Sequence, residues 1–130
     1  MIERVFILKR ADVFRDLPTE VLESLAPHLE EVELPTGRSL FEKGDLGSAM
    51  YIVVRGRVRV HDGTRTLATL EDGAVLGELS VLSSEERNAS VTAESETRLL
   101  RLDQDVLYEA MALSPALGRG FIEVLLDRFG

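Results

Sequence analysis

The middle of the chain alternates apolar and polar residues with a period of two, in short runs separated by turn-forming residues. Arg57-Val58-Arg59-Val60-His61 alternates strictly, which places the valines on one face of a strand and the charged residues on the other. Asp62-Gly63 follows directly and predicts a tight hairpin. Such runs and turns recur at intervals of about eight to twelve residues, and this spacing predicts an all-β sandwich or barrel.

Helical patterns lie on both sides of the strand region. Thr19 is expected to begin a helix as its N-cap, and Pro27 is expected to end or bend that helix. The apolar positions that share one face of this helix are Leu22, Leu25, Ala26 and Leu29.

Two further helical segments are expected after the strands. Asp103 is a candidate N-cap for a helix over residues 104–113. Residues 117–129 have a helical pattern that Gly118 and Gly120 are expected to break early, because glycine is unfavourable inside helices.

These patterns predict one domain, residues 1–130, made of three parts. Helices are expected in 1–30, a β-barrel in 31–103 and helices in 104–130. The segment shows no helix-turn-helix, catalytic or pore-forming pattern, so we expect it to be part of a larger regulatory protein.

Composition excludes several classes of function. The formal net charge of −8 argues against direct binding to nucleic acid, whose phosphates need basic patches. The absence of cysteine excludes disulfides and thiolate metal sites, and fits a cytoplasmic protein. His28 and His61 lack the spacing of metal ligands. No run approaches the ~20 apolar residues of a membrane span, and no signal peptide is visible at Met1.

One stretch combines groups that suit a phosphorylated ligand. Gly77 lets backbone approach a ligand closely, and Glu78 can accept hydrogen bonds from hydroxyls. A short run with the potential for one helical turn follows, and its first amides suit an anion. Arg87 lies nine residues after Glu78, and its fork fits a phosphate with two parallel hydrogen bonds. These groups would suit a phosphate beside a free sugar hydroxyl.

Gly77-Glu78-Leu79, the step to Arg87 and Ala89-Ser90-Val91 resemble the phosphate-binding cassette of cyclic nucleotide-binding domains. That family includes protein kinase A regulatory subunits and catabolite-activator-type transcription factors. The resemblance places the cassette at residues 76–91. It implies a mainly β fold: a jelly-roll (double-stranded β-helix) barrel flanked by N- and C-terminal α-helices.

The resemblance also implies a role for each site residue. Glu78 would hold the ribose 2′-hydroxyl of the ligand, and Arg87 would pair with its cyclic phosphate. The backbone amides of Leu79 and Ser80 would add donors. No cofactor or metal is expected besides the ligand, cAMP or cGMP, and cAMP is favoured. The expected ligand-binding residues are Gly77, Glu78, Leu79, Ser80, Arg87, Asn88 and Ala89.

Two positions depart from the family pattern. Glu86 stands where the family often has proline, and Leu76 where it often has phenylalanine. Asn88 occupies a position at which the family often has a small or hydroxyl residue that helps to distinguish guanine from adenine. An asparagine both donates and accepts, so it leaves the choice between the two bases open.

The last helix has a wide apolar stripe. In the family, a C-terminal helix covers the bound base and transmits the signal, so Phe121, Leu125 and Phe129 are candidates for contacting the base. The same stripe suits a homodimer contact or an attached effector domain. Phe41, in contrast, is expected in the core.

Other interpretations remain open at this stage. Arg87 would have an ordinary role if it were a surface arginine paired with Glu78, Glu85 or Glu86. The barrel would then be a structural or interaction module that does not bind nucleotide. A cupin-like metal enzyme is a further alternative, although no nucleophile and base lie in a suitable pattern, and no enzymatic activity is expected.

Overall fold

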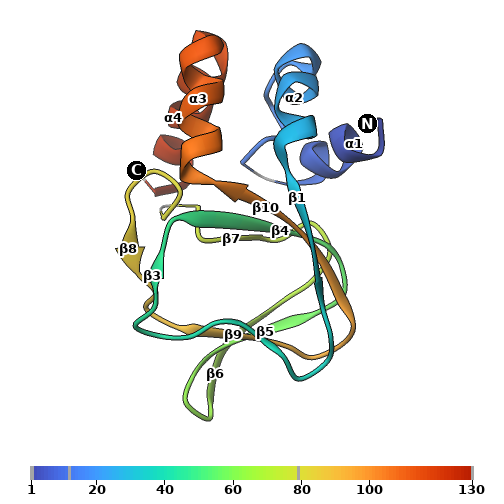
Figure 1. The fold of residues 1–130 in the computed structure, drawn as a ribbon, viewed down its shortest axis with the longest axis vertical. Helices are drawn as coiled ribbons and strands as arrows, with labels where there is room; N and C mark the ends of the chain where they lie inside the picture. The colour runs from blue at the N-terminus through green and yellow to red at the C-terminus, as the bar shows by residue number, and fades with distance from the viewer. Residues whose placement is uncertain (1, 12, 79, 130) are drawn as a thin grey trace.

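The strands form two facing sheets that make the walls of a barrel (Figure 1). The computed structural model of the chain describes residues 2–11, 13–78 and 80–129. One antiparallel sheet has the order β1-β10-β4-β7, with β1 (Glu30–Leu34), β10 (Thr97–Asp103), β4 (Ala49–Arg55) and β7 (Val75–Leu76). The other has the order β2-β9-β5-β6, with β2 (Ser39–Phe41), β9 (Ser90–Ala93), β5 (Val58–Asp62) and β6 (Arg65–Leu70).

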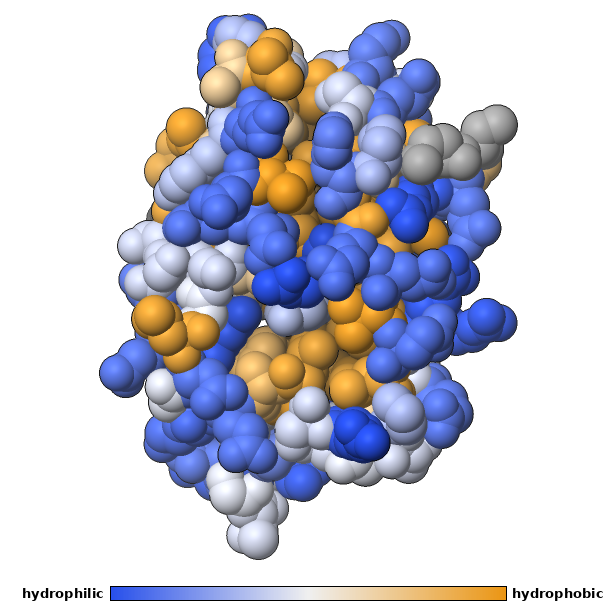
Figure 2. Space-filling view, viewed as in Figure 1, coloured by the Kyte–Doolittle hydropathy of each residue, from blue (hydrophilic) through white to orange (hydrophobic). Residues whose placement is uncertain are grey.

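A third, two-stranded sheet closes one side of the barrel (Figure 1). It pairs β3 (Leu46–Gly47) with β8 (Glu85–Glu86), in the register Leu46↔Glu86 and Gly47↔Glu85. The sequence predicted a loop at Glu85-Glu86, because two residues are too few to show a period. The expected mainly β jelly-roll barrel is confirmed. In space-filling view, apolar side chains line a hollow framed by charged ones (Figure 2).

The helices gather on one side of the barrel (Figure 1). They are α1 (Ile2–Arg10), α2 (Thr19–Leu25), the 3-10 helix η1 (Ala26–His28), α3 (Gln104–Leu113) and α4 (Pro115–Phe129). The two ends of the chain share one core, in which the rings of Phe14 and Phe121 lie 5.8 Å apart between centroids. The apolar face expected for the second helix is confirmed, since Leu22, Leu25, Ala26 and Leu29 are all buried.

Of the two predicted N-caps, Thr19 is wrong, whereas Asp103 does occupy the N-cap position of its helix. Pro18 occupies the cap position of α2, and the Thr19 hydroxyl instead accepts a hydrogen bond from Lys9 Nζ at 2.8 Å. Asp103 does precede α3, but its side chain makes no cap hydrogen bond. Its carboxylate accepts from Arg101 Nη1 at 2.7 Å, so a charged partner competes successfully with the helix amides.

The predicted break in the last helix is also wrong, because α4 continues through both glycines. A Cβ on Gly120 would lie 2.1 Å from Leu17 Cδ2, so this glycine makes room for a buried side chain. A Cβ on Gly118 would meet Met111 no closer than 3.8 Å. Gly120 therefore serves close packing, and this tertiary contact outweighs its low helix propensity.

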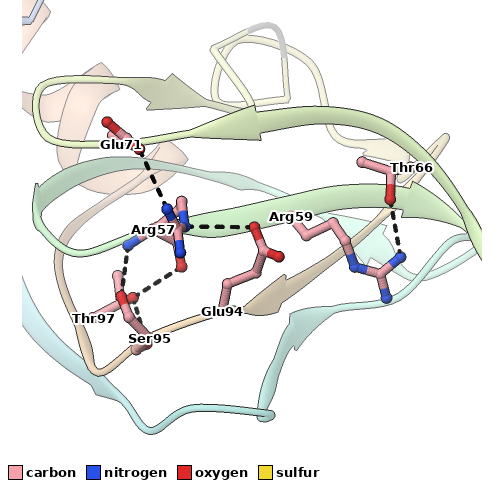
Figure 3. Close-up of polar contacts among 7 residues, drawn as sticks. All are labelled: Arg57, Arg59, Thr66, Glu71, Glu94, Ser95 and Thr97. Carbon is pink, nitrogen blue, oxygen red and sulfur yellow. Dashed lines mark hydrogen bonds and ion pairs between the residues drawn. The ribbon is translucent and has the colours of Figure 1, made fainter.

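The turn between β4 and β5 is held by polar contacts around Arg57 (Figure 3). The Arg57 amide donates to Ser95 Oγ at 3.0 Å, and its carbonyl accepts from Thr97 Oγ1 at 3.3 Å. Its guanidinium lies 3.8 Å from Glu71 and 3.7 Å from Glu94. Exposed ion pairs of this kind contribute little stability, so the backbone bonds are the main restraint on this loop.

Candidate functional site

A pocket of about 410 Å³ lies between the second sheet and the cassette, residues 76–91. The sheet contributes an apolar wall, and the cassette contributes polar groups. The apolar wall includes Phe41, Val60, Ala68, Leu70 and Val91. The cassette side includes Gly77, Glu78, Ser80, Glu85, Glu86, Arg87, Asn88 and Ala89. All the described residues that the sequence predicted for the ligand site therefore line one pocket.

Arg87 is the buried cation of this pocket, with 7% of its surface exposed. Its Nη2 donates to the Ala49 carbonyl at 2.9 Å, whereas its buried Nε has no hydrogen-bond partner among the described residues. Its backbone is fixed as well, because its amide donates to the Asp45 carbonyl at 2.7 Å and its carbonyl accepts from Gly44 at 2.8 Å. The loop of residues 44–47 thus holds Arg87 from both sides of its peptide.

Two glycines leave the space that the guanidinium fills. A Cβ on Gly47 would lie 2.1 Å from Arg87 Nε and 2.3 Å from Cζ. A Cβ on Gly77, where φ is +73°, would lie 2.5 Å from Nη1. Gly77 was predicted to allow close approach, but Gly47 was missed. The available signal was a glycine at the end of a short strand, which often marks a close approach of another group.

Phe41 covers the face of the guanidinium. Arg87 Cζ lies 4.1 Å from the centroid of the Phe41 ring, which is a cation–π contact. The same ring packs against Tyr51 at 6.1 Å between centroids and lines the pocket. The prediction that Phe41 packs in the core is confirmed, but the ring also faces the pocket, which the sequence did not indicate.

The alternative of a surface ion pair for Arg87 is wrong. Glu85 and Glu86 are exposed, and in the part of the chain that the structure describes Arg87 forms no ion pair with a carboxylate. Burial lowers the pKa of Arg87 below its ordinary value, and the positive charge of Arg101 lowers it further, although Tyr51 and Asp45 act in the opposite direction. Burial thus disfavours the positive charge of Arg87, and an anion bound beside the guanidinium would stabilise that charge.

The start of the cassette is a series of turns. Glu78 is half-buried and lines the pocket, and Leu79 lies outside the described residues. The buried Ser80 donates its amide hydrogen to the Gly77 carbonyl at 3.1 Å. Residues 78 and 80–82 have turn geometry rather than that of a helix. The Ser80 amide, one of the two expected phosphate donors, is therefore already hydrogen-bonded to another residue of the cassette.

The two residues after Arg87 are placed differently. Asn88 is exposed at the pocket edge, whereas Ala89 is buried in its lining. Ala89, just before β9, and Val91 and Ala93 within it are buried in alternation, as the period of two predicted.

Two of the three candidate base contacts of the last helix do not line the pocket in this structure. Phe121 and Leu125 lie in the core that joins the helices to the barrel, and neither lines the pocket. The side chain of Phe129 lies outside what the structure describes. Ile122 and Leu126 are the exposed apolar residues of this helix, at 54% and 63%.

The structure also bears on metal binding and on membrane insertion. Among residues 2–11, 13–78 and 80–129, no three His, Cys, Asp or Glu side chains are grouped to hold a metal ion. His61 instead contacts the Gly63 carbonyl and the Thr92 hydroxyl, each at 2.8 Å. None of the described helices is long and apolar enough to cross a membrane.

Comparison with known proteins agrees with the geometry of the pocket. The family model of the cyclic nucleotide-binding domain matches residues 31–114. The CRP-like cAMP-activated global transcriptional regulator of Mycobacterium tuberculosis is 30% identical over 127 residues, which cover 94% of this chain and 57% of the relative. The chain thus spans a little over half the length of this curated relative.

Solved structures agree as well. The N-terminal domain of a transcriptional regulator from Streptomyces coelicolor A3(2) has a TM-score of 0.89 at 29% identity, covering 94% of this chain and 89% of that one. The regulatory domain of Toxoplasma gondii PKA, solved with cAMP, has a TM-score of 0.75 at 26% identity, covering 84% and 43%. The resemblance seen in the sequence is confirmed: the chain belongs to the cyclic nucleotide-binding domain family.

Proposed function

We propose that this domain is a sensor that binds a cyclic mononucleotide, takes cAMP in preference to cGMP, and signals through its C-terminal helices. The observation that carries the proposal is the buried Arg87, which lines the pocket and whose Nε–H has no hydrogen-bond partner among the described residues. A buried cation is costly unless it is paired. The oxygens of a cyclic phosphate would accept parallel hydrogen bonds from the fork and offset that cost.

Glu78 supplies the complementary contact. It lines the same pocket, and its carboxylate would accept a hydrogen bond from the ribose 2′-hydroxyl. The amide of Leu79 remains a proposed phosphate donor. The Ser80 amide would join it only if its bond to the Gly77 carbonyl is shared or released.

The preference for cAMP is supported by the apolar wall of the pocket. Val60, Ala68 and Leu70 offer side chains without hydrogen-bonding groups. Guanine carries two exocyclic polar groups and adenine one, so guanine loses more hydration against such a wall. The names of the Mycobacterium and Toxoplasma relatives both refer to cAMP.

Signalling through the helices is supported by contacts between the middle of the cassette and α3. The Leu82 carbonyl accepts a hydrogen bond from the Tyr108 hydroxyl, and Ser84 Oγ donates to Gln104 Oε1 at 3.2 Å. Val81 lies in the same core as Phe121 of α4. A ligand that repositions the cassette would therefore shift both C-terminal helices and bias an attached effector.

Calorimetric titration of the purified domain with cAMP and cGMP tests the proposal. The unmodified domain should bind cAMP more tightly, and Arg87→Leu should weaken binding on the order of 100-fold or more, as expected for the loss of two charge-assisted hydrogen bonds. Arg59→Leu is a matched control, because Arg59 lies on β5 but does not line the pocket. Its affinity should be unchanged.

Two results would contradict the proposal. One is full cAMP affinity in Arg87→Leu. The other is an unfolding temperature that stays constant in millimolar cAMP and cGMP, since any ligand of the native state raises it. The second result would favour an interaction module that does not bind nucleotide.

A further inference from the structure

Phe41 packs against the barrel core, but its contact with Arg87 goes beyond that packing. Its ring lies flat enough over Arg87 for a 4.1 Å contact between Cζ and the ring centroid, and it also lines the pocket. We propose that Phe41 is a positioning residue, which fixes the plane of the Arg87 guanidinium for the phosphate of the ligand. This inference rests on the proposed function of the pocket and adds a determinant of its affinity.

The other contacts of Arg87 leave the orientation of its head incomplete. Nη2 is held by the Ala49 carbonyl, while Nε has no partner among the described residues. The glycines at 47 and 77 only provide space on two sides. A guanidinium held by one hydrogen bond can still rotate about it, and a ring against its face removes that freedom before the ligand arrives.

A bulge in β2 orients this ring. In the pairing of β2 with β9, Ser39 lies opposite Thr92 and Phe41 opposite Val91, so two steps along β2 match one along β9. An extra residue of this kind forms a bulge, and bulges re-aim side chains near functional sites. Tyr51 on the facing sheet then supports the ring, with an interplanar angle of 39°.

A double-mutant cycle separates this role from simple pocket lining. Phe41→Leu keeps apolar volume but loses the ring face, and we expect cAMP affinity to fall on the order of 10-fold. Phe41→Tyr keeps the face and should remain within about 3-fold of the unmodified domain. In an Arg87→Lys background, which has no planar fork to stack, Phe41→Leu should change affinity less than about 2-fold.

Val60→Ala is the matched control for the cycle. Val60 lines the pocket from β5 and is not part of the Arg87 contacts. Its effect on cAMP affinity should therefore be the same in both backgrounds, because independent sites add.

A second measurement needs no ligand. The Arg87 Nε–H signal of the free domain, observed by ¹⁵N-resolved NMR, should be shifted upfield by the ring current of Phe41. Phe41→Leu should remove that shift, and Phe41→Tyr should retain it.

The outcomes separate the positioning role of Phe41 from the proposed function of the pocket. A domain that binds neither cAMP nor cGMP overturns the proposed function, and the NMR comparison still decides whether Phe41 orients Arg87. Equal losses from Phe41→Leu in both backgrounds, or an Arg87 signal that Phe41→Leu leaves unchanged, overturn the positioning role while the proposed function stands.

Discussion

Replacing Gly47 with alanine should abolish tight ligand binding without unfolding the domain. The new Cβ would lie 2.1 Å from Arg87 Nε, 2.3 Å from Cζ and 2.6 Å from Nη2. Non-bonded heavy atoms pack at roughly 3.5–4.0 Å, so the guanidinium must move by more than about 1 Å. The backbone itself is not strained, because Gly47 does not have a positive φ.

The expected loss of cAMP affinity follows from the hydrogen bonds that the displaced guanidinium would no longer make to the phosphate. Two charge-assisted hydrogen bonds to the phosphate contribute roughly 1.5–3 kcal/mol each, so cAMP affinity should fall on the order of 100- to 10,000-fold. The atoms that must move belong to the end of a flexible side chain. The free energy of unfolding should therefore change by no more than about 1 kcal/mol.

Calorimetry with cAMP and chemical denaturation of the free domain measure the two quantities. Gly118→Ala is the control glycine, since its Cβ would meet only Met111 at an ordinary 3.8 Å. That change should leave affinity intact and raise stability by about 1 kcal/mol through helix propensity. Unchanged cAMP affinity in Gly47→Ala would refute the assignment of Arg87 as the phosphate contact in this geometry.

Three further predictions concern the surroundings of the pocket. Glu85→Gln combined with Glu86→Gln should tighten cAMP binding a few-fold in low salt and less in high salt, measured by titration, because rim carboxylates repel the phosphate. Phe121→Ala should lower the free energy of unfolding by about 3–5 kcal/mol in denaturant, yet leave the cAMP affinity of the remaining folded domain nearly unchanged; a selective loss of affinity would restore it as a base contact. Tyr108→Phe should weaken the cAMP-induced NMR shifts of α4 more than it weakens cAMP binding, and equal shifts would argue against the Leu82 contact as a route of signalling.

The sequence was most informative about features that neighbouring residues determine, such as a periodic pattern or a local motif. Alternation over Arg57-Val58-Arg59-Val60-His61 and the Asp62-Gly63 turn predicted the β5–β6 hairpin, which the structure forms with Gly63 at a φ of +57°. The cassette residues were predicted from the chemistry of Gly77, Glu78 and Arg87 together with the resemblance to the family, and the described ones meet in one pocket.

It was least informative where a role depends on a distant part of the chain. Gly47 and Phe41 become meaningful only when the β3–β8 and β2–β9 pairings bring them to Arg87. Asp103 occupies the predicted N-cap position, but its carboxylate accepts a hydrogen bond from Arg101 instead of from the helix amides. Phe121 was assigned to the ligand because a helical stripe does not reveal which surface it faces.

The carboxylates of Glu78, Glu85 and Glu86 around a single buried cation have a consequence for discrimination among nucleotides. Each additional negative charge on a molecule entering the pocket adds repulsion from this rim, while Arg87 carries the only guanidinium among the described residues that line the pocket. A cyclic monophosphate, which carries one charge, meets the smallest penalty, and a nucleoside triphosphate meets a several-fold larger one. An acidic entrance of this kind would keep the affinity for ATP and GTP low, even where their concentrations far exceed that of the ligand.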